Sequence, residues 1–150
     1  MFNNSLVLGI DLGTSGLRIA IINTKKKILF TSSIQYPNGL EIWEDWINCL
    51  RKLILEIPSD LKEKLISCSV AGTSGTLLAC QNNGMPIGEA LPYFLTCPEY
   101  SNELEQLFSQ ECAGSSISGS VGRALRLLDL YGNEIILRHQ ADWISGWLIN

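Results

Sequence analysis

One short segment of the sequence combines residue types that can bind a metal ion and a phosphate. Asp11 follows an apolar run, and two glycines, Gly13 and Gly16, enclose Thr14 and Ser15 before the next apolar run. A glycine-rich turn can direct backbone N–H groups outward as a nest for anions, and the two hydroxyls can add donors. Mg²⁺ prefers one or two carboxylates with phosphate oxygens and water, so Asp11 suits a bound Mg–phosphate. A plain hairpin with Asp11 and Thr14 bonded to the turn explains the same residues equally well.

A second polar loop repeats this design. The apolar run that ends near Gly72 leads into Thr73, Ser74, Gly75 and Thr76, and another apolar run follows. Alone, this loop would be interpreted as a polar turn. Two such loops at strand ends are what a binding cleft needs, so together they favour a site over two unrelated turns.

The elements expected around these loops form an α/β domain. Alternating or apolar segments predict strands over residues 5–11, 17–23 and 28–36, in an antiparallel meander with the three lysines 25–27 at a solvated hairpin tip. Residues 41–57 carry apolar side chains at helical spacing, with Trp43 and Trp46 on the core face, and Pro58 ends this helix.

Two buried strands, 65–72 and 76–81, are expected next, the second ended by a turn at 82–84. Helices are expected from Pro98, over 121–130 and over about 139–148. This order implies a mixed sheet with a crossover helix.

The composition is that of a globular domain. The chain has 150 residues, of which 46% are hydrophobic and 17% charged, and its net charge is -4. An acidic balance argues against nucleic acid or an anionic membrane as the main partner, and no apolar run reaches the length of a membrane span. Five widely spaced cysteines without a CxxC pair suggest neither zinc nor disulfides, so we expect reduced, mostly buried thiols in the cytoplasm, with no secretion signal.

The segment GIDLGTSGLRIAIIN resembles the first phosphate motif of the sugar kinase/Hsp70/actin superfamily. The segments that follow in order, SVAGTSGTLLACQNNGMPIGEALPYF, GRALRLLDLYGNE and HQADWISGWLIN, resemble the FGGY carbohydrate kinases, with ribulose- or xylulose-kinase-like proteins nearest. The resemblance covers essentially the whole chain. It implies a ribonuclease-H-like domain of the actin-like ATPase type, with an antiparallel three-stranded meander in a mixed sheet and flanking helices.

The implied activity is ATP-dependent phosphorylation of a sugar or polyol hydroxyl, with ATP and Mg²⁺ as cofactors. By this resemblance Asp11 would hold Mg²⁺, directly or through water. The phosphates of ATP would be contacted by Gly13, Thr14, Ser15 and Arg18. The sugar side would be lined by Thr73, Ser74, Gly75 and Thr76. The catalytic base is expected beyond Asn150, because the family places that aspartate further along the chain.

The sequence departs from the family pattern at one place in the substrate region. FGGY kinases usually show a segment such as Tyr-Asn-Asp-Ala-Arg after the second loop, and this chain reads PYFLTCPE. Phe94, Leu95 and Thr96 therefore stand where polar substrate contacts are expected. This departure weakens the transfer of the family's usual sugar specificity to this chain.

The last residues suggest an incomplete kinase domain. Two tryptophans and three aliphatic residues fall in the final eight, although domain ends usually lie in polar linkers. We expect the N-terminal part of a longer kinase or a truncated relative, with a C-terminal ATP-binding domain absent, and exposed apolar surface that promotes self-association or pairing with that domain.

Two alternatives to a kinase stay open. One is a non-catalytic remnant that binds a ligand or a partner, and the other is a chaperone-like or actin-like ATPase, which fits the second loop less well.

The other charged residues have plain interpretations. His139 has no potential metal ligand at a suitable spacing. Arg123 and Arg126 lie three residues apart on a predicted solvated helix face. The resemblance to FGGY kinases offers another interpretation of them, since that family has a basic residue near here that can face the cleft. Asp142 is expected to cap a helix or face solvent, and neither it nor Asp129 is assigned as a catalytic base.

Overall fold

The structure is a computed structural model that describes residues 5–109 and 111–149. The chain divides into two compact units. The first comprises Met1–Gly72 and Ile144–Asn150, and the second comprises Thr73–Trp143.

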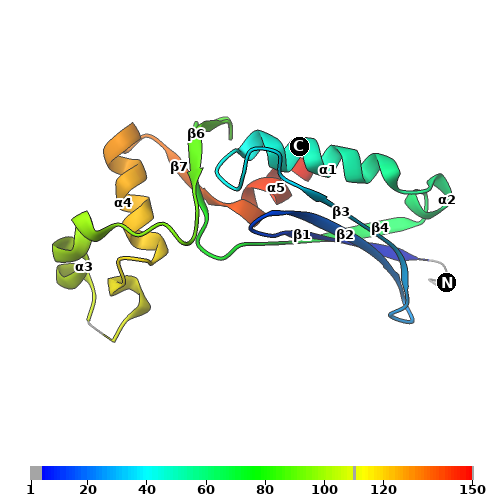
Figure 1. The fold of residues 1–150 in the computed structure, drawn as a ribbon, viewed down its shortest axis with the longest axis horizontal. Coiled ribbons are helices and arrows are strands. Elements are labelled where there is room, and N and C mark those ends of the chain that lie inside the picture. The colour runs from blue at the N-terminus through cyan, green and yellow to red at the C-terminus, as the bar shows by residue number, and fades with distance from the viewer. Residues whose placement is uncertain (1–4, 110, 150) are drawn as a thin grey trace. The chain divides into compact units, whose positions relative to one another are not determined.

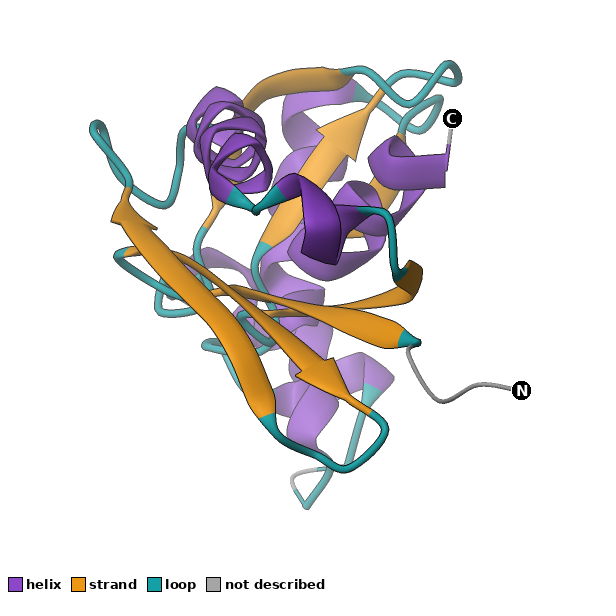
Figure 2. Cartoon of the chain, turned by 90° about the vertical axis from the view of Figure 1, so that its right-hand side faces the viewer, coloured by secondary structure: helices purple, strands orange, loops and turns teal. Residues whose placement is uncertain are grey.

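The first unit is built on a four-stranded mixed sheet in the order β3-β2-β1-β4 (Figure 1). Its strands are β1 (Leu6–Leu12), β2 (Gly16–Asn23), β3 (Ile28–Gln35) and β4 (Leu65–Gly72). β1, β2 and β3 pair antiparallel, and β4 pairs parallel to β1. The expected meander and mixed sheet are confirmed. Figure 2 shows the strands twisting past one another, as L-residues require.

One face of this sheet is buried under helix α1 (Trp43–Glu56). Alternate residues of β1 and β2 point into this core, from Leu6 to Leu12 and from Leu17 to Ile21. On α1 the fully buried side chains are Trp46, Leu50 and Leu53. Trp46 also donates its indole N–H to the carbonyl of Leu40 over 3.0 Å, so this large side chain buries no unpaired polar group.

The ends of α1 and of the β2–β3 hairpin follow local sequence rules. Ile57 is the C-cap of α1, and Pro58 follows, as expected, before the short helix α2 (Ser59–Lys62). Asn23 accepts hydrogen bonds from the backbone N–H groups of Lys25 and Lys27, which places the three lysines in an exposed turn.

β4 differs from the expectation of a buried strand. Four consecutive residues, 66–69, are exposed, and Ile66 is 62% exposed. β4 pairs with β1 along one edge, and no other described strand pairs with it. An apolar sequence favours a strand but does not show which of its faces another element will cover, which is why this prediction was wrong.

The second unit contains a separate three-stranded antiparallel sheet in the order β6-β5-β7. Its strands are β5 (Leu77–Cys80), β6 (Pro86–Leu91) and β7 (Ile136–His139). The sequence predicted β5 as a buried strand, and this is confirmed. The strand order had implied one mixed sheet, but β5 belongs to this second sheet and does not continue the first. Helix α4 (Ser120–Tyr131) packs Leu127 against Leu77 and Ala79 of β5.

The remaining helices are short. They are the 3₁₀ turn η1 (Pro98–Tyr100), α3 (Ser101–Leu107), the 3₁₀ turn η2 (Ala113–Ser115) and α5 (Gln140–Ile149). In the first unit, Arg51 of α1 lies over the ring of Trp147 at 5.2 Å, a cation–π contact. Among the helices described, none has the length and apolar character needed to cross a bilayer.

The cysteines are free thiols in the structure, as expected. Cys49, Cys80 and Cys97 are buried, whereas Cys68 and Cys112 are exposed. Burial raises the pKa of each of the three buried thiols above its ordinary value, so none of these three is a reactive thiolate at neutral pH.

Candidate functional site

The turn between β1 and β2 is closed by its two glycines. The backbone N–H of Gly13 donates to the carbonyl of Gly16 over 2.9 Å. A Cβ on Gly16 would lie 2.3 Å from the carbonyl oxygen of Ile34, so only glycine lets β2 approach β3 here. The Gly13 N–H is therefore used to shape the turn, while the side chains of Thr14 and Ser15 are exposed on it.

Asp11 and Arg18 form an ion pair beside this turn. The two residues face each other across the β1–β2 ladder, and Arg18 Nη2 lies 3.2 Å from Asp11 Oδ2. Both side chains are more than half exposed, so the pair contributes only roughly 0–1 kcal/mol to stability. The structure thus brings together the acid and the base that the sequence singled out, on the solvent-facing side of the sheet.

Small side chains leave a hollow on this face of the sheet, which we call the sheet hollow. It has a volume of about 650 Å³. Gly9, Ala20, Ser69 and Ala71 form much of its floor, and Asp11 and Arg18 line it. Because period-two alternation sends the large side chains of these strands into the core, the opposite face keeps room for a ligand.

A smaller hollow lies along the turn itself, which we call the turn hollow. Its volume is about 300 Å³, and it is lined by residues 13–18 and 33–35. Ser33 and Gln35 on β3 contribute to it, and Thr31 and Ser33 reach the sheet hollow. Sequence reasoning missed these three residues. Their signal is the polar alternation at 31, 33 and 35, which places them on one face of a strand.

The donor set around the turn suits Mg²⁺ only in company with a phosphate. Asp11 is the one carboxylate that lines either hollow, and no group of three potential metal ligands occurs within residues 5–109 and 111–149. Mg²⁺ accepts a single protein carboxylate when phosphate oxygens and waters complete its octahedron. Asp11 therefore fits a nucleotide-borne Mg²⁺, and it would not hold the ion on its own.

The second predicted loop opens the second unit, and a directional chain of hydrogen bonds fixes it. The N–H of Tyr93 donates to the Thr76 hydroxyl over 3.2 Å, and the Thr76 and Thr73 oxygens lie 2.7 Å apart. The Thr73 hydroxyl donates to Oε1 of Gln140 over 2.9 Å. Because the single hydroxyl proton of Thr73 goes to Oε1 of Gln140, which can only accept, the Thr76 hydroxyl is the donor in the contact with Thr73. Both threonine hydroxyl protons are thus engaged inside the loop.

Gln140 is a loop-holding residue that the sequence did not reveal. It is fully buried, and its Oε1 also accepts the backbone N–H of Thr73 over 3.0 Å, which fixes the orientation of its amide. Its Nε2 has no partner among the described residues. The contact joins residues 67 apart in sequence, so no local spacing could indicate it.

The four predicted residues of this loop are not equally accessible. Ser74 is exposed and Thr73 is half-buried, whereas Gly75 and Thr76 are buried. Beside the loop, Tyr93 and Phe94 are 40% and 54% exposed and meet edge to face, with ring centroids 5.3 Å apart. The accessible groups of this region are therefore the side chain of Ser74, part of Thr73 and the two aromatic rings.

Arg123 corrects the prediction of a solvated face on α4. Arg123 is only 2% exposed, while Arg126, one turn later, is partly exposed and pairs with Glu99. Arg123 precedes the buried Leu127 by four residues, so helical spacing places both on the inner face. That spacing indicated the inner face of the helix, but a charged residue on a helix is usually exposed, so Arg123 was predicted to face solvent.

The other charged residues considered in the sequence make no hydrogen bond to either loop among the described contacts. Asp129 accepts a hydrogen bond from the Tyr100 hydroxyl over 2.6 Å. His139 and Asp142 are exposed, which is one of the two places expected for each of them.

No family model matches this sequence. Solved structures do resemble it. A xyloylose kinase from Brucella ovis matches with a TM-score of 0.76 and 13% identity over 95% of this chain and 34% of its own. A xylulose kinase from Bifidobacterium adolescentis matches with a TM-score of 0.74 and 16% identity, over 97% and 34%. A glycerol kinase from Plasmodium falciparum with ADP matches with a TM-score of 0.65 and 14% identity, over 93% and 33%.

These similarities concern the fold. The chain spans about a third of the length of these kinases, and the identities are low. The structures it resembles are FGGY-type carbohydrate kinases, so the resemblance noted in the sequence is confirmed at the level of the fold.

Proposed function

We propose that this chain is part of an ATP-dependent carbohydrate kinase, a ribonuclease-H-like domain that carries the first phosphate loop and part of the sugar site. The observation that carries the proposal is the Asp11–Arg18 pair, held 3.2 Å apart next to an exposed glycine turn and two hollows. The kinase fold of the similar structures supports it, and so does the ADP named for one of them.

The pair has the charges that a Mg–phosphate ligand needs. Asp11 would hold Mg²⁺ directly or through water, and Arg18 would turn from Asp11 to the phosphate oxygens. The ion pair between the two side chains would then be replaced by one between Asp11 and Mg²⁺ and one between Arg18 and the phosphate. The hydroxyls of Thr14 and Ser15 would donate to the same oxygens, with Gly13 shaping the turn. When bound, Mg²⁺ neutralises charge on the phosphoryl group being transferred, which is the main requirement of this reaction.

The second loop would contact the sugar or polyol. Ser74 is the accessible residue of the loop, Thr73 is partly accessible, and Gly75 and Thr76 would act by fixing the position of these two. The aromatic pair Tyr93 and Phe94 offers an apolar surface where polar substrate contacts were expected. We therefore propose a substrate with a C–H-rich face, such as a ketose or polyol that can lie against a ring.

Turnover of ATP with a panel of ketoses and polyols tests this function. The complete product of the gene that encodes this chain is the protein to use. We expect one or a few sugars to stimulate ATP consumption, and Asp11→Ala to reduce kcat/KM by about a hundredfold or more, as for loss of a group that stabilises transition-state charge. Asp60→Ala, at an exposed acid on α2, serves as the control and should leave turnover unchanged.

The outcomes separate the candidate functions. Undiminished turnover in Asp11→Ala would contradict the metal role. Sugar binding without any ATP consumption would favour the non-catalytic binding module, which the exposed Tyr93 and Phe94 also suit.

A further inference from the structure

Arg123 is a buried cation that has no acidic partner in the part of the chain that the structure describes. Its guanidinium forms no ion pair within the described residues, and all its hydrogen bonds go to backbone carbonyls. Burial lowers its pKa below the ordinary value of arginine, which reflects the cost of removing the charge from water. An apolar side chain of similar volume would leave these carbonyls without their donor, so the arginine is needed for its hydrogen bonds and not to fill the core.

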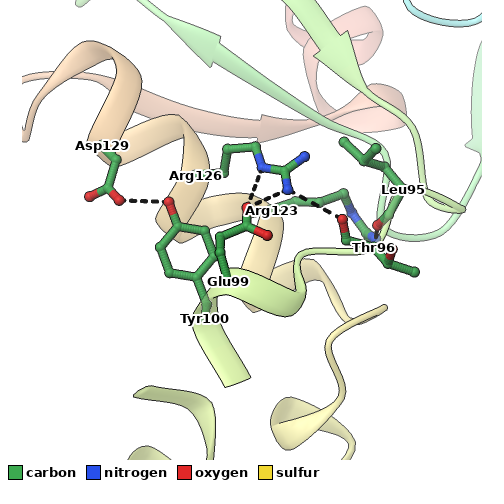
Figure 3. A network of polar contacts seen from close by, with 7 residues as sticks. All are labelled: Leu95, Thr96, Glu99, Tyr100, Arg123, Arg126 and Asp129. Carbon is green, nitrogen blue, oxygen red and sulfur yellow. Dashed lines mark hydrogen bonds and ion pairs between the residues drawn. The ribbon is translucent and has the colours of Figure 1, made fainter. Parts of the chain in front are cut away.

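The three carbonyls belong to three separate segments. Nε donates to Gly75 over 2.9 Å, and Nη1 donates to Ser118 over 3.0 Å. Nη1 also donates to Leu95 over 2.7 Å, and Figure 3 shows Arg123 and Leu95 beside each other. Gly75 lies in the second loop, Leu95 directly follows the exposed aromatic pair, and Ser118 precedes α4. One planar guanidinium therefore holds the loop, the aromatic pair and the helix start in a fixed relation, which its rigid fork of donors suits.

The fit beneath the loop is tight. Gly75 has a φ of +86°, and a Cβ at this position would lie 2.7 Å from Nη2 of Arg123. The loop thus approaches the guanidinium as closely as a backbone without a side chain allows. Glycine is required here both for its conformation and for this contact.

We propose that Arg123 is a positioning residue for the sugar. It holds Gly75 from behind, as Gln140 holds Thr73, so that the Ser74 hydroxyl is presented in one fixed place. This inference rests on the proposed function for its ligand, a sugar or polyol hydroxyl, but its structural part does not depend on that function. Preorganised donors bind more tightly because less conformational freedom is lost on binding.

The test compares Arg123→Lys with Arg126→Lys in the full protein. Lysine keeps the positive charge but lacks the planar fork of N–H donors. Arg126→Lys is the control, because Arg126 makes its contacts with Glu99 and Thr96, which lie outside the loop. We expect amide hydrogen exchange at residues 73–77 to accelerate about tenfold in Arg123→Lys, the effect of losing one charge-assisted hydrogen bond. The KM for the sugar should rise about tenfold while the KM for ATP stays unchanged, and Arg126→Lys should change neither.

Each outcome is decisive. Unchanged exchange in residues 73–77 of Arg123→Lys overturns the proposal, and so does faster exchange with an unchanged KM for the sugar in an active enzyme. If wild-type protein phosphorylates no sugar, the proposed function fails, and the exchange experiment still decides whether Arg123 holds the loop. Arg123→Gln, which can still donate to one carbonyl, replaces Arg123→Lys if the lysine variant does not fold.

Discussion

At the scale of single residues, two glycines with nearly the same φ angle make it possible to distinguish the cost of backbone strain from the cost of a steric clash when alanine replaces them. Gly75 and Gly84 have φ values of +86° and +83°, but a Cβ meets Arg123 at 2.7 Å only at Gly75 and has no neighbour within 4 Å at Gly84. A left-handed alanine costs roughly 1–2 kcal/mol, and forcing atoms into a packed site adds roughly 1–3 kcal/mol.

We therefore expect Gly75→Ala to lower the free energy of unfolding by about 2–5 kcal/mol and Gly84→Ala by about 1–2 kcal/mol. Urea denaturation of both variants gives the comparison. Equal losses would mean that the loop can move away from the guanidinium, which would contradict the tight fit described for Arg123.

The residue types in the sequence were enough to identify some of the residues of the candidate site, but not all of them. Asp11, Thr14 and Ser15 were found because an acid and two hydroxyls around glycines are unusual between apolar strands. Gln140 was not found, because its role depends on a contact over 67 positions. Arg123 was misjudged, because a charged residue on a helix is usually solvated and only its spacing from Leu127 indicated the inner face.

At the scale of elements, η1 is fastened to α4 by two polar contacts (Figure 3). Arg126 pairs with Glu99, and the Tyr100 hydroxyl donates to Asp129. A backbone hydrogen bond and the Arg126 guanidinium lower the pKa of Glu99. The hydrogen bond to Asp129 raises the pKa of Tyr100 to about 12. These shifts show that the folded state favours the charged carboxylate of Glu99 and the neutral phenol of Tyr100.

The Tyr100 contact should give stability a dependence on alkaline pH. Since the pKa of the folded state is raised, the contribution is fully present below the ordinary pKa of about 10 and is lost as the pH rises toward 12. The difference in unfolding free energy between wild type and Tyr100→Phe should therefore shrink over this range. Groups common to both proteins cancel in that difference. A difference that stays constant from pH 8 to pH 12 (roughly the range set by the ordinary pKa) would show that the hydrogen bond is absent in solution.

The elements that the sequence predicted well share strong periodicity. β1, β2 and β3 alternate, and α1 has an apolar stripe long enough to be unambiguous. β7 has four residues and no alternation that distinguishes it from a loop, so it was missed. The exposure of β4 was missed for another reason: burial depends on which elements cover a strand, and its own sequence does not carry that information.

At the scale of the whole molecule, β4 is an edge strand, since none of the described strands pairs with its outer side. Its eight residues, LISCSVAG, include no charge and no proline, the features with which natural sheets discourage edge pairing. Ile66 is 62% exposed on it. We expect the 150-residue chain to self-associate through this strand, consistent with the association anticipated from its sequence.

Ile66→Lys should reduce that association. Leu55→Lys, at a 78% exposed position on α1, is the matched control and should have a smaller effect. Size-exclusion chromatography over a range of concentrations, with binding of a hydrophobic dye, measures the change. A wild-type chain that elutes as one monomer at all concentrations and binds no dye would rule the edge out as an association surface.

The pairing of Asp11 with Arg18 also has a consequence for folding fidelity. Across the sheet, Ala71, Asp11, Arg18 and Ser33 occupy one row of the ladder. If β1 or β2 slipped by a single position, the strand's side chains would exchange faces, and a charge would enter the core beneath α1. The two charges thus disfavour the wrong strand register. Replacing them with neutral residues would remove the two groups proposed to bind Mg–phosphate and would also make misaligned sheets less costly to form.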